Sequence, residues 1–141
     1  MVVNEYKSGR EFAGRLDHGS DLFLSLLSLV EEKDIKTGIV KVIGAAKKSV
    51  VAIYDQEKKT YHNVTLEKPM EILSCIGNIS RFQGKPALHL HIVLGDHDGK
   101  AFGGHLLEGT EVFAAEFYIK ELVGDILERK YDEVTGLNLW S

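Results

Sequence analysis

Apolar side chains recur at strand spacing along most of the chain and at helical spacing in only one stretch. The β-branched and alternating runs, separated by glycine, proline and charged clusters, indicate about seven or more short strands. These runs occupy residues 2–16, 38–44, 49–54, 60–66, 70–79, 88–94 and 112–119, and residues 45–48 are expected to connect two of them. The apolar residues of the segment 131–140 are expected to dock on the body. The pattern predicts an α+β fold with a mainly antiparallel sheet in one domain, residues 1–141.

The helical stretch follows a turn at residues 17–20. Its apolar stripe consists of Leu22, Leu26, Leu29 and Val30. This spacing is typical of a helix with one buried face. Ser20 is expected to be the N-cap, and Asp21 would then stand in the first turn, where a carboxylate complements the positive end of the helix dipole. We therefore expect one principal helix packed on the sheet.

The stretch from Leu88 to Leu106 has the pattern of a β-hairpin. Its first half alternates, and one face of that strand carries Leu88, Leu90, Ile92 and Leu94. His89 and His91 then lie together on the opposite face, because side chains two apart on a strand point the same way.

The turn of this hairpin decides where a third histidine lies. A three-residue loop at 97–99, with its glycine in the left-handed conformation, sets His91 opposite His105 and His89 opposite Leu107. Cross-strand neighbours have Cβ atoms about 4.5–5.5 Å apart. In this register three imidazoles converge on one face of the hairpin.

Three histidines from two adjacent strands are a zinc-type ligand set. His89, His91 and His105 would hold the metal and leave a fourth position for water. Two alternatives stand beside this hypothesis. A bulge at Gly103 and Gly104 would shift the facing by one residue, and the histidines could instead be hydrogen-bonded residues on a half-exposed sheet face.

Composition places the chain among ordinary soluble globular proteins. It has 141 residues, of which 44% are hydrophobic and 27% charged, and its formal net charge is −4. This negative balance argues against a broadly basic surface for nucleic acid. The single cysteine, Cys75, cannot form an internal disulfide and lies in an apolar run, which fits a buried role in a reducing compartment. The first ten residues lack the apolar core of a secretory signal, and no segment is long enough to span a bilayer. We expect a cytoplasmic protein.

Four stretches of the chain carry a more specific likeness. They are residues 19–22, residues 38–45, residues 70–79, and the pair formed by Leu88-His89-Leu90-His91 with the run from Asp98 to Gly109. On these motifs the chain resembles the PPC family (plants and prokaryotes conserved domain) over nearly its whole length, in the single-domain prokaryotic form.

The resemblance implies an antiparallel sheet with one packed helix, assembled as a homotrimer. It also implies that His89, His91 and His105 occupy positions able to hold zinc. Plant members carry AT-hook segments and mediate self-association and contacts with transcription factors, and prokaryotic members are commonly labelled DNA-binding. An AT-hook needs Gly-Arg-Pro, and neither Pro69 nor Pro86 follows an arginine here. The element that would grip the DNA minor groove is therefore absent.

Three functions compete at this point. The first is a trimeric zinc-binding interaction or regulatory module, with a protein partner or a small ligand. The second is a zinc enzyme of the hydrolase or lyase type, whose general acid or base would come from Glu71, Asp96 or Glu116; no catalytic residue is assigned. The third is direct binding of DNA by a basic patch built from Lys47, Lys48, Lys58, Lys59, Arg81 and Lys85. Short lysine pairs in loops are usually solvated faces, which ranks DNA binding last.

Overall fold

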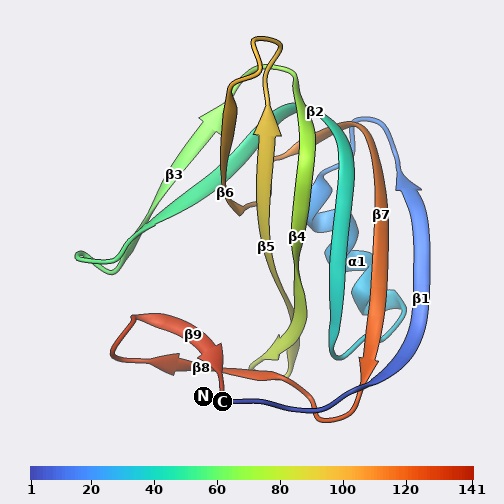
Figure 1. Cartoon of the computed structure of the whole chain (residues 1–141), viewed down its shortest axis with the longest axis vertical. Helices are drawn as coiled ribbons and strands as arrows, with labels where there is room; N and C mark the ends of the chain where they lie inside the picture. Colours follow the sequence, from blue (N-terminus) through green and yellow to red (C-terminus); the bar gives the residue numbers. More distant parts are fainter.

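The strands form one nine-stranded sheet, and a single helix covers part of one of its faces (Figure 1). The computed structural model describes all residues, 1–141. The elements are β1 Lys7–Leu16, α1 Leu22–Glu32, β2 Gly38–Asp55, β3 Thr60–Leu66, β4 Met70–Phe82, β5 Lys85–Gly95, β6 Ala101–Leu106, β7 Glu111–Val123, β8 Glu128–Asp132 and β9 Leu137–Trp140. All strand pairs are antiparallel except β4 with β8. This confirms the predicted α+β class. The helix lacks the length and the apolar run that crossing a bilayer requires.

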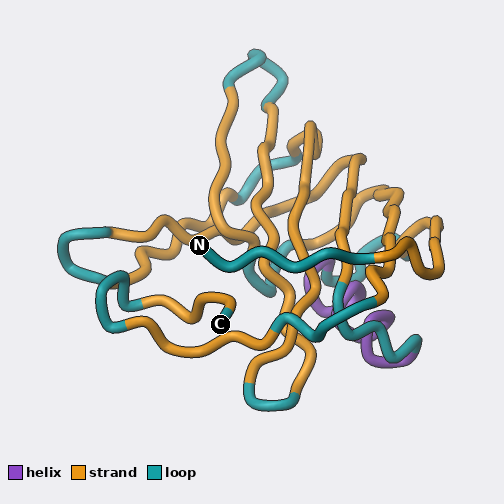
Figure 2. The backbone as a smooth tube through the Cα atoms, turned by 60° about the horizontal axis from the view of Figure 1, so that its bottom comes forward, coloured by secondary structure: helices purple, strands orange, loops and turns teal.

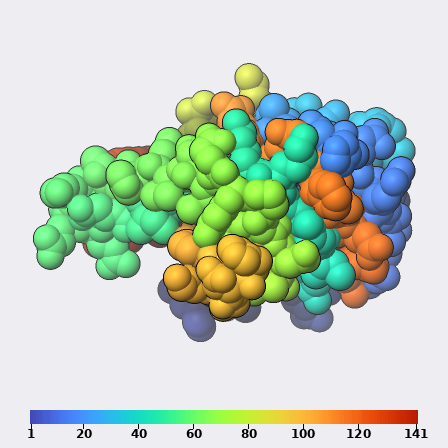
Figure 3. All heavy atoms as spheres, turned by 90° about the horizontal axis from the view of Figure 1, so that it is seen from above, coloured from blue at the N-terminus to red at the C-terminus, as the bar shows by residue number.

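Strand β2 is continuous over 18 residues, so the predicted connection at residues 45–48 is wrong. The ladder with β7 passes through these residues with register shifts on either side of Ala46. Such irregularities bend a strand without ending it. The first half of β2 pairs with β4 and β7, and its second half pairs with β6 and β3. The β2–β3 hairpin consequently projects from the body of the protein (Figures 1 and 3).

Helix α1 begins one residue later than the sequence predicted. Asp21 is the N-cap, and its carboxylate accepts a hydrogen bond from the Leu24 amide at 2.8 Å. Ser20 does not cap, because its hydroxyl donates to the Asp17 carbonyl at 2.7 Å. The predicted stripe is confirmed in its buried members, Leu22, Leu26 and Val30.

The core lies between the helix and one face of the sheet. Its strand residues include Val40 and Val42 of β2, Leu90 and Ile92 of β5, and Ile119 of β7. The alternate residues of these strands lie on the opposite side, which no helix covers. We call this side the open face, and it carries Ile39, Lys41, Ile43, Ile76, His89, His91 and Tyr118, related by direct cross-strand pairing. Core and open face thus alternate along the same strands.

The C-terminal hairpin, β8 with β9, attaches to the end of β4 through the only parallel pairing in the sheet. Leu137, Leu139 and Trp140 line a cavity against the sheet, as their predicted docking requires. Val134 remains 82% exposed at the hairpin turn, so its predicted docking is wrong. The two ends of the chain lie close together (Figures 1 and 2).

Candidate metal centre

The β5–β6 hairpin has the turn and register that the sequence predicted. The Asp96 amide donates to the Lys100 carbonyl and the Gly99 amide donates to the Asp96 carbonyl, each at 3.0 Å. Gly99 has φ +76°, a conformation that residues with a Cβ rarely adopt. His91 pairs directly with His105. This confirms the register on which the convergence of the histidines depended.

Two details of the hairpin differ from or refine the prediction. The ladder ends at the His91–His105 pair, so His89 has no partner in Leu107. The reason is that β6 leaves β5 there and joins β2, where the Leu107 amide donates to the Val50 carbonyl at 3.1 Å. The ladder runs through Gly103 and Gly104 without a register shift, so the alternative bulge does not form.

The structure brings the three predicted histidines together. One ring nitrogen from each of His89, His91 and His105 lies within 4.8 Å of the other two. Nε2 of His89 and Nε2 of His91 are separated by 3.2 Å. His89 and His105 are partly buried, whereas His91 is exposed. The remaining histidines, His18, His62 and His97, lie outside this cluster.

The neighbouring strand β4 fixes the backbone at His89. Gly77 approaches β5 so closely that a Cβ placed there would lie 1.8 Å from the His89 carbonyl oxygen. Only glycine accepts this approach without moving one of the strands. Its neighbour Asn78 pairs with His89 across the ladder. The sheet, rather than a loop, therefore positions the imidazole.

The electrostatics of the cluster favour uncharged imidazoles. Burial, with His105, Arg129 and His91 acting in the same direction, lowers the pKa of His89 to about 4. Burial also lowers the pKa of His105, with His91 and Arg129 acting in the same direction. At neutral pH both rings are neutral and can offer a lone pair to a cation.

The residues present fit a metal ion. His105 Nδ1 is buried and has no hydrogen-bond partner in the protein, an arrangement that is costly unless a ligand satisfies it. Imidazole ligands suit zinc, copper, iron and nickel, and three of them leave a tetrahedral site with one open position. The cluster can therefore hold a cation that keeps one coordination position free.

None of the acidic residues considered as a general acid or base belongs to the histidine cluster. Asp96 sits in the hairpin turn, where its carboxylate accepts from Lys68 Nζ at 2.8 Å. That bond, with the backbone amides of Lys100 and Asp98, lowers the pKa of Asp96 to about 2. Glu71 and Glu116, like Asp96, are absent from the cavity described next. Cys75 is buried, and burial raises the pKa of its thiol to about 12.

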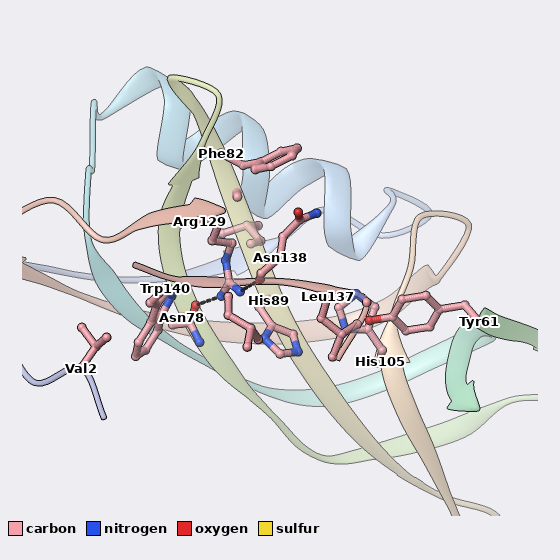
Figure 4. A pocket seen from close by; sticks show the side chains of 14 residues that line it. Val2, Tyr61, Asn78, Phe82, His89, His105, Arg129, Leu137, Asn138 and Trp140 are labelled. Carbon is pink, nitrogen blue, oxygen red and sulfur yellow. Dashed lines mark hydrogen bonds between the residues drawn. The ribbon is translucent and has the colours of Figure 1, made fainter. Parts of the chain in front are cut away.

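A cavity of about 610 Å³ adjoins the cluster, between the open face and the C-terminal hairpin (Figure 4). Its lining includes His89, His105, Tyr61, Asn78, Arg129 and Trp140. Sequence reasoning did not identify Arg129, Asn78 or Tyr61 as site residues. Arg129 reaches the site through the parallel pairing of β8 with β4, and no local sequence pattern signals a contact of that kind.

Comparisons with known proteins assign this chain to a family. A model of the Plants and Prokaryotes Conserved (PCC) domain matches residues 3–123. The chain belongs to this family. The family, also abbreviated PPC, is the one that the sequence motifs indicated. Residues after 123, including Arg129 and the C-terminal hairpin, lie beyond the matched part.

Solved structures agree with this assignment. A metal-containing protein from Archaeoglobus fulgidus is 45% identical, with 100% of this chain and 99% of that one covered and a TM-score of 0.95. A PPC protein from Pyrococcus horikoshii is 37% identical, with 100% and 97% covered and a TM-score of 0.93. A candidate DNA-binding protein from Bacteroides thetaiotaomicron is 29% identical, with 98% of both chains covered and a TM-score of 0.86.

Among curated proteins, the chain is similar to part of the bifunctional protein GlmU from a Synechococcus strain. The two are 26% identical over 129 residues, which are 90% of this chain. The PPC chain spans about a fifth (20%) of the length of that relative.

Proposed function

We propose that this PPC protein is a cytoplasmic, homotrimeric metal-binding module in which His89, His91 and His105 hold one zinc ion per chain. The observation that carries the proposal is the convergence of three ring nitrogens within 4.8 Å. The lowered pKa values of His89 and His105 and the unpaired Nδ1 of His105 support it. The metal-containing relative from Archaeoglobus fulgidus supports a metal without naming which one. Zinc bound to three imidazoles supplies a Lewis acid at its fourth position.

Metal analysis of the purified protein tests this site. We expect about one zinc per chain in the wild type and almost none in His91→Ala, because two imidazoles rarely hold the ion. His62→Ala is the matched control, since His62 is exposed and outside the cluster, and it should keep full occupancy. Full occupancy in His91→Ala would show that the ligand set is wrong.

The trimer is supported by apolar side chains on the open face. Ile76, Ile43 and Tyr118 are each about half exposed (50%, 51% and 52%), and Ile39 on the same face is 37% exposed. Lys41 lies between Ile76 and Tyr118, but apolar side chains gathered on one face in this way are more typical of an interface than of a solvated surface. The assembled protein would act as an interaction or regulatory module, with the metal close to the contacts between its subunits.

Light scattering at micromolar concentration tests the assembly. We expect three times the mass of one chain for the wild type and a smaller mass for Ile76→Asp, which places a charge in the proposed interface. Val134→Asp is the control, because Val134 is exposed at the far end of the C-terminal hairpin. A wild type with the mass of one chain would contradict the trimer.

A zinc enzyme of the hydrolase or lyase type is the second candidate. One observation favours it, the cavity directly beside His89 and His105. No aspartate or glutamate lines that cavity, so the chain itself offers no carboxylate as a general base there. Hydrolysis of p-nitrophenyl acetate by the zinc-loaded wild type, lost in His91→Ala, would favour the enzyme over the module.

A further inference from the structure

The cavity beside the histidines contains one arginine without a carboxylate partner. Arg10 pairs with Glu121, and Arg81 pairs with Asp34. Arg129 is partly buried and belongs to none of the ion pairs of the protein. A guanidinium withdrawn from water without a counter-charge is costly, and such groups are usually paired or bind a ligand.

Neutral acceptors hold Arg129 in one orientation. Its Nε donates to Ser80 Oγ, its Nη2 donates to Asn78 Oδ1 and its Nη1 donates to the Asn138 carbonyl, each at 2.8 Å. A guanidinium has five N–H groups. These three bonds therefore leave one N–H free on each of Nη1 and Nη2.

The surroundings of Arg129 are apolar on one side and lined by neutral imidazoles on the other. The Trp140 ring centroid lies 5.7 Å from its Cζ, and Leu137 also lines the cavity. On the other side, His89 and His105 line the same cavity as Arg129. Figure 4 shows the guanidinium between Asn78 and the histidines. No acidic side chain lines the cavity, so a metal on three neutral imidazoles would add positive charge that no residue there balances.

We infer that this cavity binds a small organic carboxylate, whose anionic end lies between Arg129 and the metal position and whose apolar part packs against Leu137 and Trp140. A carboxylate is planar and matches the paired N–H groups of an arginine. The volume of about 610 Å³ falls within the range of small-molecule sites. This inference rests on the proposed metal site only for its second anchor, because Arg129 is positioned by the protein alone.

Fluorescence of Trp140 reports on this cavity, because Trp140 is the single tryptophan of the chain. The probes are benzoate, its neutral analogue benzamide, and inorganic phosphate, titrated into zinc-loaded and metal-free protein. We expect a saturable change with benzoate and at least about a tenfold weaker response with benzamide. Phosphate should bind more weakly than benzoate because it has no apolar part. Equal binding of benzoate and benzamide, or tighter binding of phosphate, would overturn the inference.

Two variants locate the site. Arg129→Gln should weaken benzoate binding about tenfold or more, because it removes the charged donor. Arg15→Gln removes the same charge from an exposed arginine and should bind benzoate like the wild type. Equal weakening in both variants would show general charge attraction and overturn the site. Should Arg129→Gln unfold, the comparison of benzoate with benzamide on the wild type still decides the question.

Metal content separates this inference from the proposed function. Benzoate binding that depends on Arg129 in protein without metal would support the anion site even if the zinc proposal failed. Protein that holds about one zinc per chain and shows no response to benzoate would overturn the anion site and leave the zinc site standing.

Discussion

The two faces of strand β5 carry different tasks on alternate residues. Leu88, Leu90, Ile92 and Leu94 are buried in the core, whereas His89 and His91 stand on the open face. The core face is buried and packs in one cluster with the helix, and the open face keeps polar rings beside a cavity. One strand can thus present metal-ligand side chains on one face while the residues that stabilise the fold lie on its other face. Substitutions on the two faces should therefore have separable effects.

The largest expected effect tests the core side of this contrast. Leu90 is 0% exposed, so Leu90→Ala should lower the free energy of unfolding by about 2–5 kcal/mol through lost burial and a cavity. His91 follows Leu90 directly but is exposed. His91→Ala should therefore change the free energy of unfolding by about 0.5 kcal/mol or less in metal-free protein. Denaturant unfolding of the metal-free variants measures both. A similar loss in the two would break the separation of the faces.

At Gly77, the packing of the core and the position of His89 depend on the same close approach of β4 to β5. Gly77→Ala would force β4 and β5 apart at the His89 carbonyl, which should lower the free energy of unfolding by about 1–3 kcal/mol and weaken zinc binding together with it. Ser74→Ala, on an exposed side chain of the same strand, is the control. Chemical unfolding and a zinc titration measure the two quantities. Unchanged zinc affinity in Gly77→Ala would mean that the ladder does not position His89.

The pH dependence of stability sharpens the contrast on the open face. The pKa of His89 is about 4 in the folded protein, against an ordinary value of 6.5. Between these values the unfolded chain binds the proton and the folded protein does not, so the free energy of unfolding of metal-free protein should fall as the pH falls from about 6.5 to about 4. Below about 4 both states bind the proton, and this contribution levels off.

Urea unfolding at a series of pH values measures this slope. His89→Asn should lose part of it, whereas His62→Asn, which changes an exposed histidine, should retain it. The same slope in wild type and His89→Asn would show that His89 is not held neutral by its surroundings.

The smallest expected effect concerns DNA. A face that grips duplex gathers several basic side chains, and its affinity falls steeply with salt. The open face carries Lys41 and Lys120, with Glu116 and apolar residues between and around them, and the chain has a net charge of −4. We expect duplex binding no tighter than about 10⁻⁴–10⁻⁶ M at physiological salt. A titration of labelled duplex at two salt concentrations checks this, and sequence-specific nanomolar binding would reverse the ranking.

The sequence predicted best where the determining interactions are local. Alternation from Leu88 to Leu94 and the glycine at position 99 were sufficient to place His91 opposite His105. The failures have non-local causes. The bend of β2 at Ala46 depends on its pairing with β7, and the position of Arg129 depends on a parallel contact between β8 and β4. The N-cap shifted from Ser20 to Asp21 because both residue types can cap, and only the tertiary structure selects between them.

The nearness of the chain ends to the cavity affects how the protein should be prepared. Val2 and Trp140 both line that cavity, so a peptide fused to either terminus would emerge beside His89 and His105. A polyhistidine purification tag would bring competing imidazoles to the proposed zinc position and could supply the fourth ligand itself. Metal analysis and carboxylate titrations should therefore use tag-free protein. A spacer between the tag and the chain would not prevent the interference, because tethering keeps the local concentration of the tag high.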